Sequence, residues 1–229
     1  MTDQRTALVV GASRSLGLGL VRRLLEHGWT VIGTVREGSR TPLHELADVT
    51  GPALAIETVD TTDQASIESL RARLAGVRID LLLVNAGVTD PDEPVGAVPT
   101  EVFTRVMVTN ALGPMRIIET LGTAVADDGT IAVMSSRQGS VSLNTRGGHE
   151  VYRASKAALN SLMRSYAARG TDPRTLLLLH PGWVQTELGG EGAPLTVDQS
   201  TAGLVEVLEQ HGHAGGLRFL DHAGDDVAW

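Results

Sequence analysis

Uninterrupted runs of apolar residues recur along the chain, and stretches with helical spacing separate them. A strand covered by helices on both faces gives such a run, whereas a half-exposed strand alternates between apolar and polar residues. Strands that alternate with helices form a parallel sheet with right-handed crossovers. The sequence therefore predicts an α/β fold with a doubly wound parallel sheet of about seven strands and helices on both faces. The runs are residues 6–10, 30–35, 53–56, 79–84, 130–134 and 176–179, with a short edge strand at 217–220.

Length and composition limit the class of protein. The 229 residues suit one large α/β domain, and no repeat or linker divides them, so we expect residues 1–229 to form a single domain. The net charge of −8 argues against nucleic acid and anionic membranes as partners. Without cysteine there is no disulfide or thiolate site, and we assign no metal. No signal-like or membrane-spanning run is present, so a cytoplasmic protein is the default expectation.

A glycine-rich stretch directly follows the first apolar run and leads into a helical pattern that reaches Gly28. Glycine permits a tight turn and a close approach of the backbone to a pyrophosphate, which then sits on the amides of the helix N-terminus. A plain strand-to-helix turn is the alternative. The position at the first strand of a βαβ unit favours a dinucleotide-binding loop. The candidate residues are Gly11, Ser13, Arg14, Ser15, Leu16 and Gly17.

The second apolar run ends at Arg36 and offers no carboxylate there. An acidic residue at this point would hold the ribose 2′-hydroxyl of NAD, whereas an arginine accommodates a 2′-phosphate. Arg14 supplies a second positive charge nearby. We therefore predict NADP(H) in preference to NAD(H), with a solvated strand end as the alternative explanation of Arg36.

Tyr152 lies four residues before Lys156, the only lysine of the chain. On a helix this spacing places both side chains on one face. A fixed positive charge favours the phenolate, and lowering the tyrosine pKa by about two units requires only about 2.7 kcal/mol. We interpret Tyr152 as a general acid/base whose pKa Lys156 lowers. A chance pair on a surface helix is the alternative.

Other polar residues follow strands or interrupt helices. Asp60 lies at the carboxyl end of the third run, where it either faces a ligand or belongs to the cap of a helix that we expect from Thr62 to about residue 75. A long helix is expected at about 101–126, and Gly113-Pro114 interrupts it. Asn110 precedes this interruption and is either structural or close to spare backbone groups and water. Small residues also close the fourth run, at Asn85, Ala86 and Gly87.

In this order the motifs resemble those of the short-chain dehydrogenase/reductase family over essentially the whole chain. The matching residues are Gly11 to Gly17, Asn85 to Gly87, Asn110, Ser135-Ser136, Tyr152 with Lys156, and Pro181-Gly182-Trp183-Val184 with Thr186. The Gly147-Gly148 insertion, His180 before Pro181 and the last residue Trp229 resemble the C-factor or sniffer-type carbonyl reductase subgroup. The resemblance implies a single Rossmann domain that binds NAD(P) and transfers a hydride between nicotinamide and a carbonyl or alcohol.

The resemblance also implies residue roles. Tyr152 would donate the proton, Ser136 would hold the substrate oxygen, and Lys156 would lower the Tyr152 pKa and bind the nicotinamide ribose. Asn110 would hold a water that links Lys156 to solvent for proton relay. Pro181, Gly182, Val184 and Thr186 would seat the carboxamide end of the nicotinamide, Asp60 would lie against the adenine, and Asn85, Ala86 and Gly87 beneath the adenosine ribose.

Two features depart from the family pattern. Ser15 replaces the middle glycine of the first loop, which puts the cofactor affinity in question, and the gap between Ser136 and Tyr152 is longer than in many members. Ser136 is preferred to Ser135 because it matches the second serine of the family's pair.

These observations favour an NADP(H)-dependent carbonyl reductase or alcohol dehydrogenase acting on a small molecule. The alternative is an NADP(H)-binding sensor or signalling protein without turnover. A nucleotide-sugar epimerase or dehydratase fits less well, because the segment after Thr186 is too short for a further substrate domain. The family implies a homodimer or homotetramer paired through the helices at about 113–126 and 152–169, and it also contains monomers. The expected walls of the substrate pocket are Arg137, Gln138, Val141, Leu143, Trp183 and Leu188.

Overall fold

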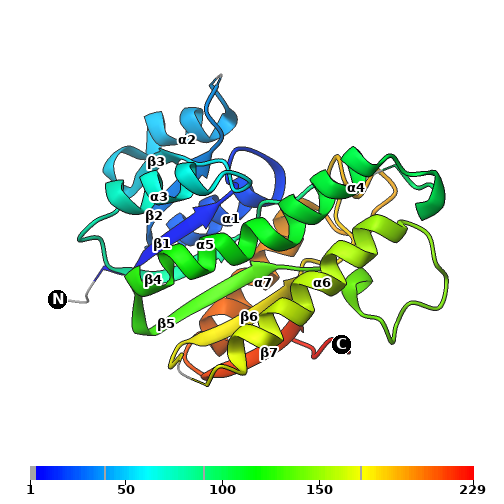
Figure 1. Cartoon of the computed structure of the whole chain (residues 1–229). Helices are drawn as coiled ribbons and strands as arrows, with labels where there is room; N and C mark the ends of the chain where they lie inside the picture. Colours follow the sequence, from blue (N-terminus) through cyan, green and yellow to red (C-terminus); the bar gives the residue numbers. More distant parts are fainter. Residues whose placement is uncertain (1–3, 39, 90, 171) are drawn as a thin grey trace.

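Seven parallel strands form one sheet in the order β3-β2-β1-β4-β5-β6-β7 in the computed structural model, which describes residues 4–38, 40–89, 91–170 and 172–229 (Figure 1). The predicted doubly wound α/β fold is confirmed, and β7 is the predicted edge strand. The strands are β1 Thr6–Val10, β2 Thr30–Val35, β3 Leu54–Thr58, β4 Ile79–Val84, β5 Val125–Met134, β6 Thr175–His180 and β7 Gly216–Asp221.

Helices cover both faces of this sheet and bury a separate hydrophobic core on each (Figure 1). Alternate strand residues face opposite cores: Leu8 and Val10 contribute to one, Ala7 and Val9 to the other. The first core is closed by α3 Gln64–Arg73, α5 Gly113–Leu121 and α6 Glu150–Ala167. The second is closed by α1 Ser15–Glu26, α2 Pro42–Thr50 and α7 Val197–His211, and α4 Thr100–Met107 lies beside α6.

The sequence analysis missed one helix and misplaced two helix boundaries. Helix α2 was not predicted, because its apolar pattern is short: Leu43, Leu46 and Ala47 have helical spacing, but only Leu43 is fully buried. The helix expected to reach residue 126 ends at Leu121, because β5 begins at Val125 and pairs with β4 across a register shift. The cap of α3 is Asp63, whose carboxylate accepts the N–H of Ala65, and not Thr62.

A π-helical turn at Val108–Leu112 joins α4 to α5. The N–H of Gly113 donates to the carbonyl of Val108, five residues earlier. Pro114 has no N–H to donate to the carbonyl of Asn110, and its ring would clash with that carbonyl in a regular α-helix. The predicted interruption at Gly113-Pro114 therefore takes the form of a π turn, a feature that is frequent at functional sites.

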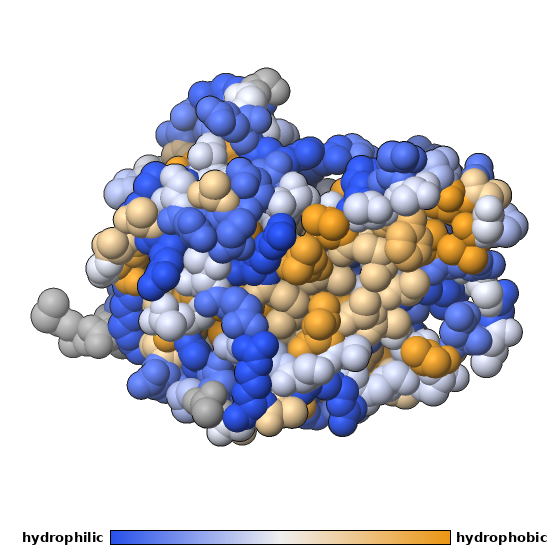
Figure 2. All heavy atoms as spheres, in the orientation of Figure 1, coloured by the Kyte–Doolittle hydropathy of each residue, from blue (hydrophilic) through white to orange (hydrophobic). Residues whose placement is uncertain are grey.

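Figure 2 shows hydrophobic residues gathered over the face that carries α4, α5 and α6. Phe103, Leu112 and Leu162 are among the large apolar side chains exposed on these elements and the turn between them. Within the part of the chain that the structure describes, no helix has the length and apolar character needed to span a membrane.

Candidate active site

Tyr152, Lys156 and Ser136 meet at the carboxyl end of β5, where the first turns of α6 pass over the sheet. The Tyr152 hydroxyl is hydrogen-bonded to the Ser136 side chain. The Lys156 Nζ lies 5.8 Å from the centroid of the Tyr152 ring and donates to the carbonyl of Met134 at 2.9 Å. The spacing of four residues therefore places both side chains on the face of α6 that is turned toward β5.

Gly139 allows the short 3₁₀ turn Arg137–Gly139 to pack against α6. A Cβ atom at Gly139 would lie 2.8 Å from the backbone carbonyl carbon of Lys156, which is closer than real side chains approach. The two elements that carry Ser136 and Lys156 can therefore pack this closely only because residue 139 has no side chain.

Ser135 and Ser136 differ in what their hydroxyls contact. The Ser135 hydroxyl is buried and donates to Oδ1 of Asn160 on α6 at 2.6 Å. The Ser136 hydroxyl accepts the N–H of Gln138 at 3.1 Å and is the one bonded to Tyr152. Both hydroxyls thus contact α6 but at different positions, and only the second serine is bonded to the phenol.

The expected direction of the Tyr152 pKa is wrong for this structure. Burial raises the pKa of Tyr152 to about 12, and the hydrogen bond from Ser136 opposes this only in part. Burial also lowers the pKa of Lys156 to about 8. The sequence shows that the pair exists, but the loss of solvent around both groups depends on the packing of α6 on β5.

Asn110 is fully buried, and its side-chain amide is held by protein groups. Its Oδ1 accepts the N–H of Val88 at 2.8 Å, and its Nδ2 donates to the Val88 carbonyl at 2.8 Å and to the Ser155 hydroxyl at 3.0 Å. Of the two roles considered for Asn110, the structural role therefore applies to its side chain. The backbone carbonyl, which Pro114 leaves without its usual donor, is the group suited to a water.

The glycine-rich loop is closed by contacts that exclude side chains. Gly11 has φ +85°, and a Cβ atom there would lie 2.9 Å from the backbone of Ala86. At Gly17 a Cβ atom would lie 2.1 Å from the Gly11 carbonyl oxygen, which itself accepts the side-chain amide of Asn85 at 2.9 Å. Asn85, Ala86 and the two glycines thus fix the shape of this turn together.

Ser15 has φ +51° and is the first residue of α1. It therefore adopts the left-handed conformation that glycine takes without strain, at a cost of about 1–2 kcal/mol. The departure from the family pattern keeps the path of the loop and adds a hydroxyl at the helix N-terminus.

The charged residues predicted for the adenosine end lie at the surface. Arg14 forms an ion pair with Glu187. Asp60 accepts the N–H and the hydroxyl of Thr62 at 2.8 and 2.7 Å. These hydrogen bonds, and to a smaller extent the charge of Arg36, hold the pKa of Asp60 below its usual value. Asp60 therefore belongs to the turn before α3 and also lies within electrostatic reach of Arg36.

The segment after β6 is held in a compact loop. Gly182 has φ +83°, and a Cβ atom there would lie 2.4 Å from the Leu195 side chain. The Pro181 carbonyl accepts a hydrogen bond from the Ser200 hydroxyl at 2.6 Å, and the Thr186 hydroxyl donates to the Val184 carbonyl at 3.3 Å. The four predicted residues of this segment, Pro181, Gly182, Val184 and Thr186, thus form one loop at the carboxyl end of β6.

The sequence did not single out Ser155, Asn160 or Thr34. Ser155 and Asn160 connect α6 to Asn110 and Ser135, and the Thr34 hydroxyl accepts the N–H of Gly11 at 3.1 Å. A signal for Asn160 was available in the sequence. It lies one helical turn after Lys156 and therefore on the same face of the helix, where a polar residue among apolar ones is expected to have a partner.

The model of the family described as short chain dehydrogenase matches residues 5–194. The chain therefore belongs to the short-chain dehydrogenase/reductase family and is an oxidoreductase of that family.

Two curated relatives are similar to this chain. The 1-hydroxy-2-glutathionyl-2-methyl-3-butene dehydrogenase of Rhodococcus sp. (strain AD45) is 34% identical over 98% of this chain and 99% of the relative. The C-signal protein of Myxococcus xanthus is 38% identical over 66% of this chain and 93% of that protein.

Solved structures are similar over nearly the entire length. A short-chain dehydrogenase/reductase from Burkholderia multivorans with bound NADP is 49% identical, with a TM-score of 0.97 over 99% of this chain and 100% of that one. The carbonyl reductase Sniffer of D. melanogaster is 28% identical, with a TM-score of 0.92 over 99% of this chain and 100% of that one. The resemblance to the C-factor and sniffer-type subgroup is thus confirmed.

Proposed function

We propose that this protein is an NADP(H)-dependent carbonyl reductase or alcohol dehydrogenase for a small-molecule substrate. The observation that carries the proposal is the phenol of Tyr152 hydrogen-bonded to Ser136, with the buried ammonium of Lys156 one helical turn away. An acid, a hydroxyl and a cation in this order suit a carbonyl oxygen that takes up a proton during reduction.

Ser136 and Tyr152 share the substrate oxygen in this proposal. The Ser136 hydroxyl donates a hydrogen bond that orients the oxygen, and the Tyr152 hydroxyl donates its proton to that oxygen. In the reverse direction Tyr152 accepts the proton of the alcohol. When bound, the nicotinamide supplies or accepts the hydride. Preorganised donors at an oxygen that gains charge are effective because they need not reorient during the reaction.

Lys156 stabilises the phenolate that Tyr152 forms on losing its proton. A charge close to the ring favours the ionised phenol, even where burial raises the resting pKa. We further assign Lys156 to the nicotinamide ribose hydroxyls. The backbone carbonyl of Asn110 holds a water on the path from Lys156 to solvent.

The predicted cofactor residues would hold NADP(H) from end to end. Residues 11–17 would receive the pyrophosphate on the N-terminus of α1, and the loop from Pro181 to Thr186 would seat the nicotinamide. Arg14 and Arg36 favour a 2′-phosphate over a free 2′-hydroxyl, and the Burkholderia structure contains NADP. Asp60, in reach of Arg36, would lie beside the adenine.

The relative named C-signal is the reason to keep a second candidate function, an NADP(H)-binding signalling protein without turnover. A protein relieved of catalysis has no need to keep Asn110, Ser136, Tyr152 and Lys156 together. The enzymatic function is therefore favoured, and measured turnover separates the two candidates.

Homo-oligomerisation through α5 and α6 is also part of the proposal. The hydrophobic face over α4, α5 and α6 supports a dimer or tetramer (Figure 2). Light scattering coupled to gel filtration would distinguish these assemblies from a monomer.

Turnover of aldehydes, ketones and alcohols with each of the two cofactors tests the function directly. We expect reduction with NADPH to exceed reduction with NADH, and Arg36→Ala to lower the ratio of their kcat/KM values about tenfold or more, the effect of losing a charge-assisted contact. Arg40→Ala, which removes a nearby arginine paired with Asp48, is the matched control. An unchanged ratio in Arg36→Ala would refute the NADP(H) preference, and tight NADPH binding without turnover of any carbonyl would favour the signalling candidate.

A further inference from the structure

We propose that Trp229 is a positioning residue for the substrate side of the site. It braces residues 137–144, which directly follow Ser136, against the helix that carries Tyr152 and Lys156. This inference rests on the proposed function, because it concerns the placement of the groups that would bind the carbonyl.

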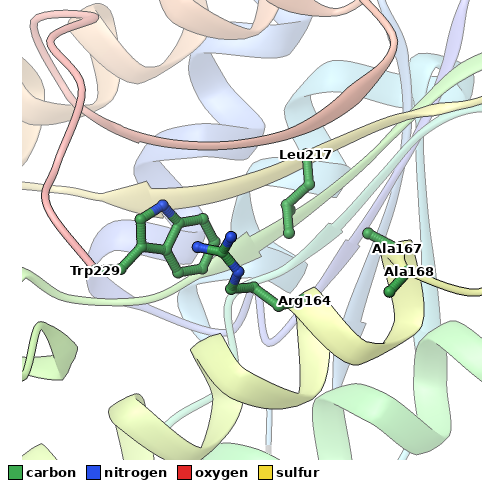
Figure 3. A pocket seen from close by; sticks show the side chains of 5 residues that line it. All are labelled: Arg164, Ala167, Ala168, Leu217 and Trp229. Carbon is green, nitrogen blue, oxygen red and sulfur yellow. The ribbon is translucent and has the colours of Figure 1, made fainter.

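The indole of Trp229 is held by two side chains from different elements. Its ring packs edge-to-face on Phe219 of β7, with ring centroids 5.7 Å apart. The guanidinium of Arg164 on α6 lies over the indole at 4.4 Å from its centroid (Figure 3). The chain between Phe219 and Trp229 turns back along β7, and the N–H of Val227 donates to the Phe219 carbonyl at 2.8 Å. The position of the indole is therefore tied to both β7 and α6.

The backbone oxygen of Trp229 is bound to the segment after Ser136. It accepts the Ser142 hydroxyl at 2.8 Å and the Ser142 N–H at 3.4 Å. Ser142 in turn lies 3.2 Å from the buried Ser140 hydroxyl, which accepts the N–H of Leu143 at 3.3 Å. Leu143, a predicted wall of the substrate pocket, packs against the core beneath α6.

Hydrogen bonds continue from this segment to Ser136 itself. The N–H of Ser140 donates to the Arg137 carbonyl at 3.1 Å, and the N–H of Gly139 donates to the Ser136 carbonyl at 2.8 Å. Asn160 of α6 donates to the Gly139 carbonyl at 3.2 Å. A continuous set of contacts thus runs from Trp229 to the backbone of Ser136, whose hydroxyl is bonded to Tyr152.

The surroundings of the indole allow its removal without opening a buried cavity. Trp229 is half-buried, and a surface hollow of about 320 Å³ lies beside it, lined also by Arg164, Ala167, Ala168 and Leu217 (Figure 3). Truncation would enlarge this hollow instead of creating an internal void, so we expect the variant to fold. The effect should fall on residues 137–144.

Trp229→Ala in the full chain tests this role. We expect kcat/KM for a carbonyl substrate to fall about tenfold, as loss of an aromatic pair and a cation–π contact allows. The dissociation constant of NADPH should stay within about twofold, and amide hydrogen exchange should accelerate in 137–144. Trp229→Phe, which keeps a ring, should recover part of the loss. Arg169→Ala is the matched control, because it removes a similar cation–π contact, with Tyr166 of α6, together with an ion pair to Glu119.

Ser142→Ala provides a variant of an exposed residue that should fold normally, with an expected loss of about threefold in kcat/KM. The proposal is overturned if both variants match Arg169→Ala in kcat/KM and in hydrogen exchange. A wild-type protein that turns over no carbonyl would sink the proposed function, whereas the exchange measurement would still show whether Trp229 holds the segment.

Discussion

The two ends of α6 each carry one of the two tyrosines of the chain, and burial raises the pKa of both phenols to about 12. Their neighbours differ. Tyr166 donates to a carboxylate oxygen of Asp172 at 2.7 Å, and the negative charge of that carboxylate raises the Tyr166 pKa further. Tyr152 contacts a neutral hydroxyl, and the nearest charge is the ammonium of Lys156.

A shifted pKa therefore does not identify a catalytic acid by itself. At Tyr166 the phenol donates a hydrogen bond to Asp172, whose carboxylate is also paired with Arg174. At Tyr152 the neighbours are a hydroxyl and an ammonium, both of which can stabilise the phenolate once the proton has left. The chemical identity of the neighbours distinguishes a structural tyrosine from a catalytic one.

The largest expected effect comes from removing each phenol hydroxyl in turn. Tyr152→Phe should lower kcat by about 10² to 10⁴, the usual contribution of a placed acid, while NADPH binding is retained. Tyr166→Phe should keep turnover and lose about 1–3 kcal/mol of unfolding free energy, because it removes a hydrogen bond to a charged acceptor. Steady-state kinetics and urea titration measure the two quantities. Equal losses of kcat in both variants would erase the distinction between the two ends of α6.

The paired serines give the next largest effect. Ser136→Ala should reduce kcat about a hundredfold, as loss of a preorganised donor at the reacting oxygen does. Ser135→Ala should instead cost about 1–3 kcal/mol of stability, because it leaves Oδ1 of the buried Asn160 without its donor. If Ser135→Ala impairs turnover more than Ser136→Ala at equal folded fraction, the assignment of the two hydroxyls is reversed.

A third expected effect is the pH dependence of stability that Lys156 imposes. Its pKa is about 8 in the folded protein against 10.5 for an unperturbed lysine, so between these values the unfolded chain binds more protons. The free energy of unfolding should therefore rise with pH from about 8 to 10 through this group. Above pH 10 the raised pKa values of the two tyrosines act in the opposite sense.

Urea unfolding at several pH values would reveal this dependence, and Lys156→Met should abolish the rise between pH 8 and 10. A rise that persists in Lys156→Met would assign it to other groups. Arg164→Ala, on the same helix and without a buried charge, should retain the wild-type slope.

The sequence predicted the sheet because its central strands are covered by helices on both faces and so appear as apolar runs. It did not predict α2, a short helix in which Leu43 alone is fully buried. It also did not predict where α5 ends and β5 begins, because no charged residue separates Leu121 from Val125. The motifs located the site because spacing along one helix and order along parallel strands determine which residues meet. The direction of the Tyr152 pKa and the partners of Ser135 depend on packing between elements far apart in the sequence, which no local pattern records.

Because Lys156 is the only lysine in the chain, a protein grown with isotope-labelled lysine carries a single labelled side chain. Its nuclear magnetic resonance signal would be assigned at once, because no other labelled side chain would give a signal. Following that one resonance during titration, or as compounds from a screening library are added, would report from the interior of the candidate site in real time, without an optical assay or a known substrate.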